Sequence, residues 1–148
     1  MLYTVGEMAK LLGIAPSALR YYDKEGLLPF LERSEGGKRI FKDSDYEGLQ
    51  VIECLKKTGM QLKDIRDFIH MLMQGDDTID DRLQLFLKRR EEVKRQIADL
   101  QDTLDTIDFK CWYYETAKQS GTTALLENMK IEELPEQYQA VRKKLRRE

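Results

Sequence analysis

The N-terminal part of the chain holds side chains whose types and spacing suit contact with nucleic acid. Four of them recur every three or four residues, so a helix would place them on one face: Ser17, Arg20, Tyr21 and Lys24. Arginine can donate two hydrogen bonds to guanine or phosphate, and a tyrosine hydroxyl donates to phosphate without adding charge. Three more cations follow a Gly-rich stretch and suit contacts to a phosphate backbone: Lys38, Arg39 and Lys42.

Two thiols offer a different chemistry. Cys54 lies close to Lys56 and Lys57, which could favour a reactive thiolate. The same cysteine would share a helix face with apolar residues, where a thiol commonly packs as a small hydrophobe. Both interpretations of Cys54, as a sensor and as a core residue, stay open.

Cys111 is followed by an aromatic cluster: Trp112, Tyr113 and Tyr114. This cluster is either core packing or the lining of a small hydrophobic effector cavity. The one histidine, His70, has no acidic or cysteine ligands arranged around it as a local metal motif. We expect neither a metal site nor a cofactor, and the lack of a base motif or a phosphate-binding loop argues against an enzyme.

Two short helices must position the basic face. Thr4 and Glu7 form a capping-box pattern that begins the first helix, and Gly13 ends it. Pro16 suits the first turn of a second helix, which carries the basic face and stops at Gly26. Two short helices joined by a Gly-containing turn predict a helix-turn-helix, whose second helix can enter the major groove.

A β-hairpin and two further helices are predicted next. Apolar runs on both sides of a Gly-rich turn at 34–37 are typical of a hairpin. A hairpin in this place can act as a wing along the DNA backbone. Helices follow over about 43–59 and 61–74, and Gly75 is the expected stop of the second one.

One long helix is predicted over residues 78–119, which contain neither proline nor glycine. Its apolar positions alternate in steps of four and three, so they form a heptad seam of about five repeats. Arg90 and Cys111 also occupy seam positions. A helix of roughly 60 Å buries such a seam only against a partner, which predicts a homodimer. The pattern does not choose between parallel and antiparallel pairing, and folding back onto the chain's own domain is the alternative.

The last part of the chain is less regular. Apolar residues between 125 and 134 could form a short amphipathic helix, and the basic run 142–147 is interpreted as a solvated tail, with an added phosphate contact as the alternative. The predicted domains are a winged helix-turn-helix domain at 1–75, a coiled-coil dimerisation helix at 76–120, and a short effector or packing segment with the basic tail at 121–148.

Length and composition limit the classes of protein to which the chain can belong. The 148 residues suit one domain with an extension. The net charge of −2 argues mildly against nucleic acid, but residues 1–42 carry seven basic and five acidic side chains. No apolar run is long enough for a transmembrane helix, and no signal-peptide pattern opens the chain, so we expect a cytoplasmic protein without membrane contact. Two distant cysteines make no disulfide framework.

Three stretches resemble the N-terminal signature of the MerR family of bacterial transcription regulators: TVGEMA at 4–9, LRYYDKEGLL at 19–28 and GKRIF at 37–41. The resemblance covers about residues 2–73. It implies a mainly α fold, in which a winged helix-turn-helix domain with two wings precedes a long helix that forms an antiparallel coiled-coil dimer. It also implies a bacterial cytoplasmic activator that binds a pseudo-palindromic operator in double-stranded promoter DNA. Effector binding would distort that DNA, so that RNA polymerase recognises both promoter elements.

The resemblance also assigns site residues. Arg20 and Tyr21 would face the groove and the phosphates, with Tyr22 beside them, although adjacent tyrosines on a helix cannot both point the same way. Arg39 and Phe41 would belong to the first wing. The second wing, between the third and fourth helices, would place two lysines near the DNA backbone: Lys57 and Lys63. The full predicted set is Ser17, Arg20, Tyr21, Tyr22, Lys24, Lys38, Arg39, Phe41, Lys42, Lys57 and Lys63.

The effector is less well indicated. Around Cys54 the stretch VIECLKKTGM at 51–60 resembles a subgroup that responds to reactive aldehydes or other electrophiles through a lone cysteine. Metal-sensing members use a cysteine pair after the dimer helix, and residues 116–148 contain no cysteine. The same segment is too short for a separate ligand-binding domain. The competing function is a coiled-coil interaction module that binds protein instead of DNA, which the acidic net charge favours.

Overall fold

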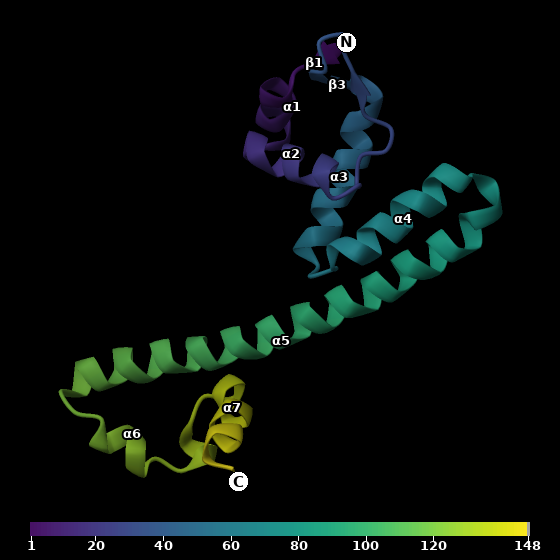
Figure 1. The fold of residues 1–148 in the computed structure, drawn as a ribbon. Coiled ribbons are helices and arrows are strands. Elements are labelled where there is room, and N and C mark those ends of the chain that lie inside the picture. Colours follow the sequence, from purple (N-terminus) through teal and green to yellow (C-terminus); the bar gives the residue numbers. More distant parts are fainter. Residues whose placement is uncertain (148) are drawn as a thin grey trace. The chain divides into compact units, whose positions relative to one another are not determined.

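The computed structural model describes residues 1–147 and separates into two compact units, Met1–Glu92 and Val93–Glu148. Helices dominate both units, which confirms the predicted mainly α class (Figure 1). Within the described residues, no helix combines the length and the apolar character needed to span a lipid bilayer.

The first unit begins with the predicted helix-turn-helix. Helix α1 (Val5–Leu12) has a complete capping box, because the Thr4 hydroxyl accepts from the Glu7 amide and the Glu7 carboxylate accepts from the Thr4 amide at 2.8 Å. Gly13 ends α1 with a φ of 70°, a left-handed conformation that glycine adopts without strain. Helix α2 (Pro16–Lys24) follows after a tight turn, with Pro16 in its first turn.

A small antiparallel sheet follows the helix-turn-helix. Strands β2 (Glu32–Arg33) and β3 (Arg39–Lys42) form the predicted hairpin, and Gly37, at a φ of 75°, closes the turn between them. Strand β1 (Leu2–Tyr3) pairs with the other edge of β3, so the strand order is β1-β3-β2. The sequence analysis missed β1, because two residues are too short to show an alternating pattern.

Two helices complete the first unit: α3 (Asp43–Lys57) and α4 (Leu62–Gln74), the latter ended by Gly75 as predicted. The core gathers apolar residues from all four helices, from β3 and from the connecting segments. Its buried members are Met8, Ala9, Leu19, Tyr22, Leu27, Leu28, Phe41, Leu49, Ile52, Leu55, Met60, Ile65, Phe68 and Ile69.

Helix α5 (Ile79–Ser120) follows a short 3-10 helix at Asp76–Thr78 and is 42 residues long, close to the predicted span. Its first turns belong to the first unit, where Phe86 packs edge-on against Phe68 with ring centroids 5.3 Å apart. The compact unit therefore reaches Glu92, beyond the predicted boundary at residue 75.

The predicted seam of α5 is exposed to solvent in the single chain. Between 40% and 69% of the surface is exposed at each of these apolar positions: Ile79, Leu83, Phe86, Ile97, Leu100, Leu104, Ile107 and Tyr114. These apolar side chains form an exposed stripe along the helix, which is interrupted by Arg90 and by the half-buried Val93.

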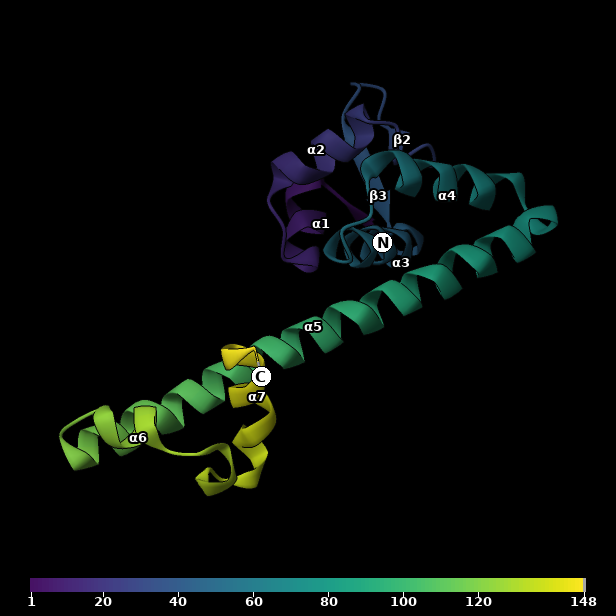
Figure 2. The same cartoon turned by 90° about the horizontal axis from the view of Figure 1, so that it is seen from below.

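The second unit packs the C-terminal part of α5 against three short helices: α6 (Ala124–Asn128), a 3-10 helix at Ile131–Glu133, and α7 (Glu136–Arg146). Its core consists of Phe109, Tyr113, Ala117 and Leu126. Both views show α7 beside α5 (Figures 1 and 2).

The prediction of a solvated basic tail is wrong for Arg142 alone, because Lys143, Lys144, Arg146 and Arg147 are exposed as expected, although most of the run belongs to helix α7. Arg142 is buried in α7, where its Nη2 donates to the Leu126 carbonyl at 3.2 Å. Its guanidinium carbon lies 5.8 Å from the ring centroids of both Phe109 and Tyr113. Aromatic faces attract a guanidinium group, and this tertiary contact packs α7 against α5 through Arg142.

Candidate nucleic-acid interface

The outer face of α2 exposes to solvent the four residues that were predicted to contact DNA. All four are exposed: Ser17, Arg20, Tyr21 and Lys24. Leu19 and Tyr22 point the other way and are buried in the core. Packing on one side thus leaves α2 with a polar face, of the kind that a helix needs in order to enter a DNA groove.

Tyr22 is a core residue, so the prediction that it contacts DNA directly is wrong. Its side chain is 1% exposed, and its hydroxyl donates to the carboxylate of Glu53 and accepts from Lys56 Nζ at 2.6 Å. Burial, together with the hydrogen bond to Glu53, raises the pKa of Tyr22 above its ordinary value. Tyr22 therefore anchors α2 on α3.

The hairpin supplies part of the predicted basic segment. Lys38 is exposed at the turn, and Lys42 forms an ion pair with Glu32 across the two strands. Phe41, in contrast, is fully buried, because alternation along β3 points it into the core opposite Tyr3. The expectation that the Phe41 side chain belongs to the DNA-contacting surface is therefore wrong.

A single carboxylate connects the hairpin to α2. Asp23 Oδ2 accepts from Arg33 Nη2 and from Arg39 Nε, each at 2.7 Å. Arg33 and Arg39 face each other in the register of β2 and β3. The wing is thus hydrogen-bonded to the last turn of the helix that it accompanies.

The segment between α3 and α4 corresponds to the predicted second wing. Lys57 and Lys63, at its two ends, are both exposed. Arg66, one turn into α4, donates from Nε to the Glu25 carbonyl at 2.7 Å and pairs with the Glu25 carboxylate at 3.6 Å. This contact holds the start of α4 at the C-terminal end of α2 (Figure 2).

Both cysteine thiols are free and exposed. Cys54 lies on α3 between the buried residues Ile52 and Leu55, but its own side chain faces solvent. The core interpretation of Cys54 is therefore wrong, because the thiol falls on the outer side of α3. His70 is exposed as well, and no group of three or more potential metal ligands occurs within the described residues.

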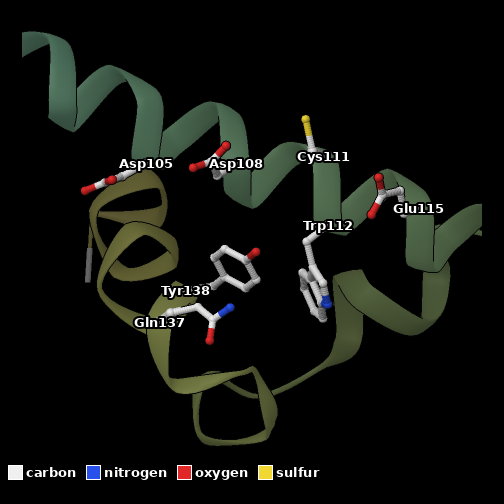
Figure 3. Close-up of a pocket in the computed structure, with 7 residues that line it drawn as sticks. All are labelled: Asp105, Asp108, Cys111, Trp112, Glu115, Gln137 and Tyr138. Carbon is white, nitrogen blue, oxygen red and sulfur yellow. The ribbon is translucent and has the colours of Figure 1, made fainter.

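The aromatic cluster at the end of α5 does not form the hydrophobic cavity that was considered. Tyr113 is in the core and Tyr114 is exposed on the seam. Trp112 packs against Tyr138 of α7, with ring centroids 5.2 Å apart and the rings tilted by 30°, along an open groove of about 430 Å³ (Figure 3). Most of the groove's other lining is polar: Asp105, Asp108, Cys111, Glu115 and Gln137. Three carboxylates make this groove a poor site for an uncharged hydrophobic molecule.

Comparison with known proteins decides the family. Residues 3–72 match the model of the MerR HTH family regulatory protein, and residues 46–108 match that of the MerR DNA-binding region. An uncharacterised HTH-type transcriptional regulator of Haemophilus influenzae is 43% identical over 136 residues, which cover 92% of this chain and 98% of the relative. The chain belongs to the MerR family of transcriptional regulators.

Solved structures of MerR family proteins agree with this assignment. HiNmlR, described as a MerR family regulator lacking the sensor domain and bound to promoter DNA, shares 46% identity and a TM-score of 0.76, covering 83% of this chain and 98% of its own. A MerR family regulator from Bacillus thuringiensis shares 43% identity and a TM-score of 0.71, covering 75% and 97%. Escherichia coli ZntR is 31% identical, covering 68% and 72%. These relatives are named as transcriptional regulators.

The residues that connect the interface of this MerR family protein escaped the sequence analysis. Asp23, Glu53 and Arg66 each join α2 to another element through a charged hydrogen bond. The only available signal was opposite charge. In a sequence with 35% charged residues, charge alone does not single out the pairs that meet.

Proposed function

We propose that this MerR family regulator binds an inverted-repeat promoter operator as a homodimer and activates transcription by distorting the DNA. The observation that carries the proposal is the exposed polar face of α2, hydrogen-bonded through Asp23 to the first wing and through Glu25 and Arg66 to α4. The relative HiNmlR, seen on promoter DNA, supports the same use of this domain.

The exposed seam of α5 supports the homodimer. Leu100 and Leu104 are 69% and 48% exposed in the single chain. Burying apolar surface stabilises a protein by about 25 cal/mol per Å², and a second copy of the same helix offers a matching stripe. Two chains joined in this way would present two copies of α2 to one duplex.

The charge distribution along α5 favours antiparallel pairing. Residues 82–96 contain six basic and two acidic side chains, whereas residues 97–111 contain four acidic and one basic. A parallel, in-register pair would place each segment against its own like charge. An antiparallel pair that crosses near residue 96 places the basic segment beside the acidic one, which also offers opposite charge to Arg90 on the seam.

An antiparallel dimer has two-fold symmetry, so its DNA site should be an inverted repeat. Arg20 and Tyr21 would contact bases or phosphates in the major groove, with Ser17 and Lys24 beside them. The wing cations Lys38, Arg39, Lys42, Lys57 and Lys63 would contact the flanking phosphates. Distorting the promoter costs free energy on the order of a few kcal/mol, as bending DNA does. The distortion would affect RNA polymerase only through the DNA. We place the protein in the bacterial cytoplasm, where the promoter lies.

The DNA-binding proposal is tested with Arg20→Ala and Arg39→Ala. Loss of one arginine contact should cost about 1–3 kcal/mol of DNA affinity, measured by titrating an inverted-repeat duplex while sedimentation monitors the dimer. Lys118→Ala, which removes a cation from the second unit, is the matched control and should bind as the wild type does. Unchanged affinity in both arginine variants would contradict the assigned contacts, and no binding of the duplex by the wild type would favour a protein-interaction module without DNA binding.

For the effector, we propose that the Cys54 thiol reacts with electrophiles such as aldehydes. The exposure of its side chain on α3 supports this role. Cys54→Ser should leave DNA affinity unchanged and abolish induction by electrophiles in a transcription assay. Cys111→Ser is the control, since it removes the other exposed thiol. Normal induction of the Cys54 variant would remove the sensor proposal and leave DNA binding intact.

A further inference from the structure

A carboxylate at a DNA-binding surface requires an explanation. Asp23 lies on the last turn of α2, and its side chain is 17% exposed. Phosphates repel a negative charge nearby, so on charge alone Asp23 weakens DNA binding. Its hydrogen bonds to Arg33 and Arg39 indicate what the carboxylate does instead.

The two arginines are held in different ways. Arg33 gives Nη2 to Asp23 and Nη1 to the Gly37 carbonyl at 3.2 Å, so its guanidinium is engaged inside the wing. Arg39 gives its Nε to Asp23, and this is the only hydrogen bond of its side chain found in the described part of the chain. The two Nη groups of Arg39 are thereby left to donate to a phosphate, in the forked geometry that suits this anion.

We propose that Asp23 is a positioning residue for DNA recognition. It fixes the first wing against α2 and orients the Arg39 guanidinium, while Arg33 braces the wing turn through Gly37. This inference rests on the proposed DNA binding. Arg33 and Arg39 thus have different roles, although their positive charge alone would suggest that both contact phosphate.

Asp23→Asn tests the proposal because a role through charge alone and a positioning role predict opposite changes in DNA affinity. If Asp23 contributes only its charge, the neutral variant should bind DNA more tightly. If Asp23 positions Arg39, the variant should bind about tenfold or more weakly, although it is more positive by one charge. Glu35→Gln, which makes the same charge change at the exposed wing turn, is the matched control and should bind equally or more tightly.

The probe is an inverted-repeat duplex selected from random DNA by the wild-type protein, titrated at several salt concentrations. We expect Asp23→Asn to lower the salt slope by roughly one, because one phosphate contact is lost. With Arg39→Ala already present, adding Asp23→Asn should change the affinity little, since the group that Asp23 orients is gone. Thermal unfolding of each variant separates a lost fold from a lost contact.

Three outcomes decide the inference. Weaker binding by a folded Asp23→Asn protein, with the effect largely lost in the Arg39→Ala background, supports positioning. Equal or tighter binding by that variant, or an equal loss in the Arg39→Ala background, overturns it and leaves the proposed function standing. If the wild type selects no inverted repeat at all, the proposed function itself fails.

Discussion

The two compact units differ in how far each buries its own apolar residues. The first unit encloses fourteen buried side chains in one core, drawn from helices and sheet alike. The second has a smaller core around Phe109, Tyr113, Ala117 and Leu126, and along its part of α5 Ile97 and Leu100 remain 61% and 69% exposed. The first unit therefore completes its core within one chain, whereas the stripe on α5 needs a second copy.

The two units therefore differ in their proposed function: the first forms the DNA-binding surface, and helix α5 pairs two chains. In the first unit, Tyr22, Asp23 and Glu25 connect α2 to α3, the hairpin and α4 by hydrogen bonds, so the reading surface is set within one chain. The seam residues Ile97 and Leu100 of helix α5 instead remain exposed and are available for pairing. The domain that reads DNA is thus built independently of the contact that would set the spacing of two such domains.

The largest effect is expected from Leu100→Asp on the seam of α5. Each copy loses the burial of one leucine, worth about 1.5–3 kcal/mol, and an unpaired charge is buried as well. The dimer dissociation constant should therefore rise by about two to four orders of magnitude, measured by sedimentation equilibrium. Ala98→Asp adds the same charge outside the seam and should leave the dimer intact. If Leu100→Asp stays dimeric at the wild-type affinity, the seam is not the interface.

The next largest effect distinguishes the two cores. Phe41→Ala and Phe109→Ala each remove a fully buried ring, at a cost of about 3–5 kcal/mol. Phe41→Ala should destabilise the first unit and abolish DNA binding. Phe109→Ala should make α6 and α7 sensitive to protease and leave the first unit folded, measured by limited proteolysis with DNA titration. Collapse of the first unit in the Phe109 variant would show that the two cores are not independent.

A smaller effect is expected from Tyr22→Phe, which removes two hydrogen bonds at a cost of about 1–3 kcal/mol near neutral pH. The folded pKa of Tyr22 is raised above the ordinary value of 10.0, so its stabilisation is complete below that pH and is lost as the pH rises. Denaturant unfolding of the wild type should show stability falling above about pH 10.

The pH dependence of Tyr22→Phe should be flatter than that of the wild type. Tyr46→Phe, at an exposed position on α3, serves as the control and should follow the wild type. An equally steep alkaline loss in Tyr22→Phe would assign the effect to other groups.

The smallest effect is expected from Lys144→Ala on α7. Lys144 pairs with Asp102, but both side chains are about 60% exposed, and such pairs contribute roughly 0–1 kcal/mol. Arg142→Ala, two residues earlier, removes a buried guanidinium that lies over two aromatic rings and should cost clearly more. Thermal unfolding compares the two variants, and equal effects would contradict the packed role of Arg142.

Much of the fold was predictable because its signals are local. The capping box at Thr4, the proline at residue 16 and the glycines at 13 and 75 mark helix ends whatever the tertiary structure. The heptad seam predicted α5 for the same reason. Strand β1 and helix α7 were missed or misinterpreted, because β1 depends on pairing with β3 and α7 depends on the contact of Arg142 with Phe109.

In the candidate site, too, the features with local sequence signals were predictable and those that depend on tertiary contacts were not. Helical spacing was enough to predict that Ser17, Arg20 and Tyr21 share an exposed face. It also indicated that the two adjacent tyrosines cannot point the same way, but only the packing of α2 on α3 identifies Tyr22 as the buried one. Hydrogen bonds between distant residues, such as that of Asp23 to Arg39, depend on the folded arrangement and leave no periodic signal.

We infer that two chains, paired through α5, present two DNA-binding domains to one operator. Sedimentation of the protein with an inverted-repeat duplex, compared with a duplex carrying one half-site, tests it most directly. We predict two protomers on each inverted repeat and much weaker binding to the half-site. One protomer per duplex, with equal affinity for both DNAs, would contradict the account.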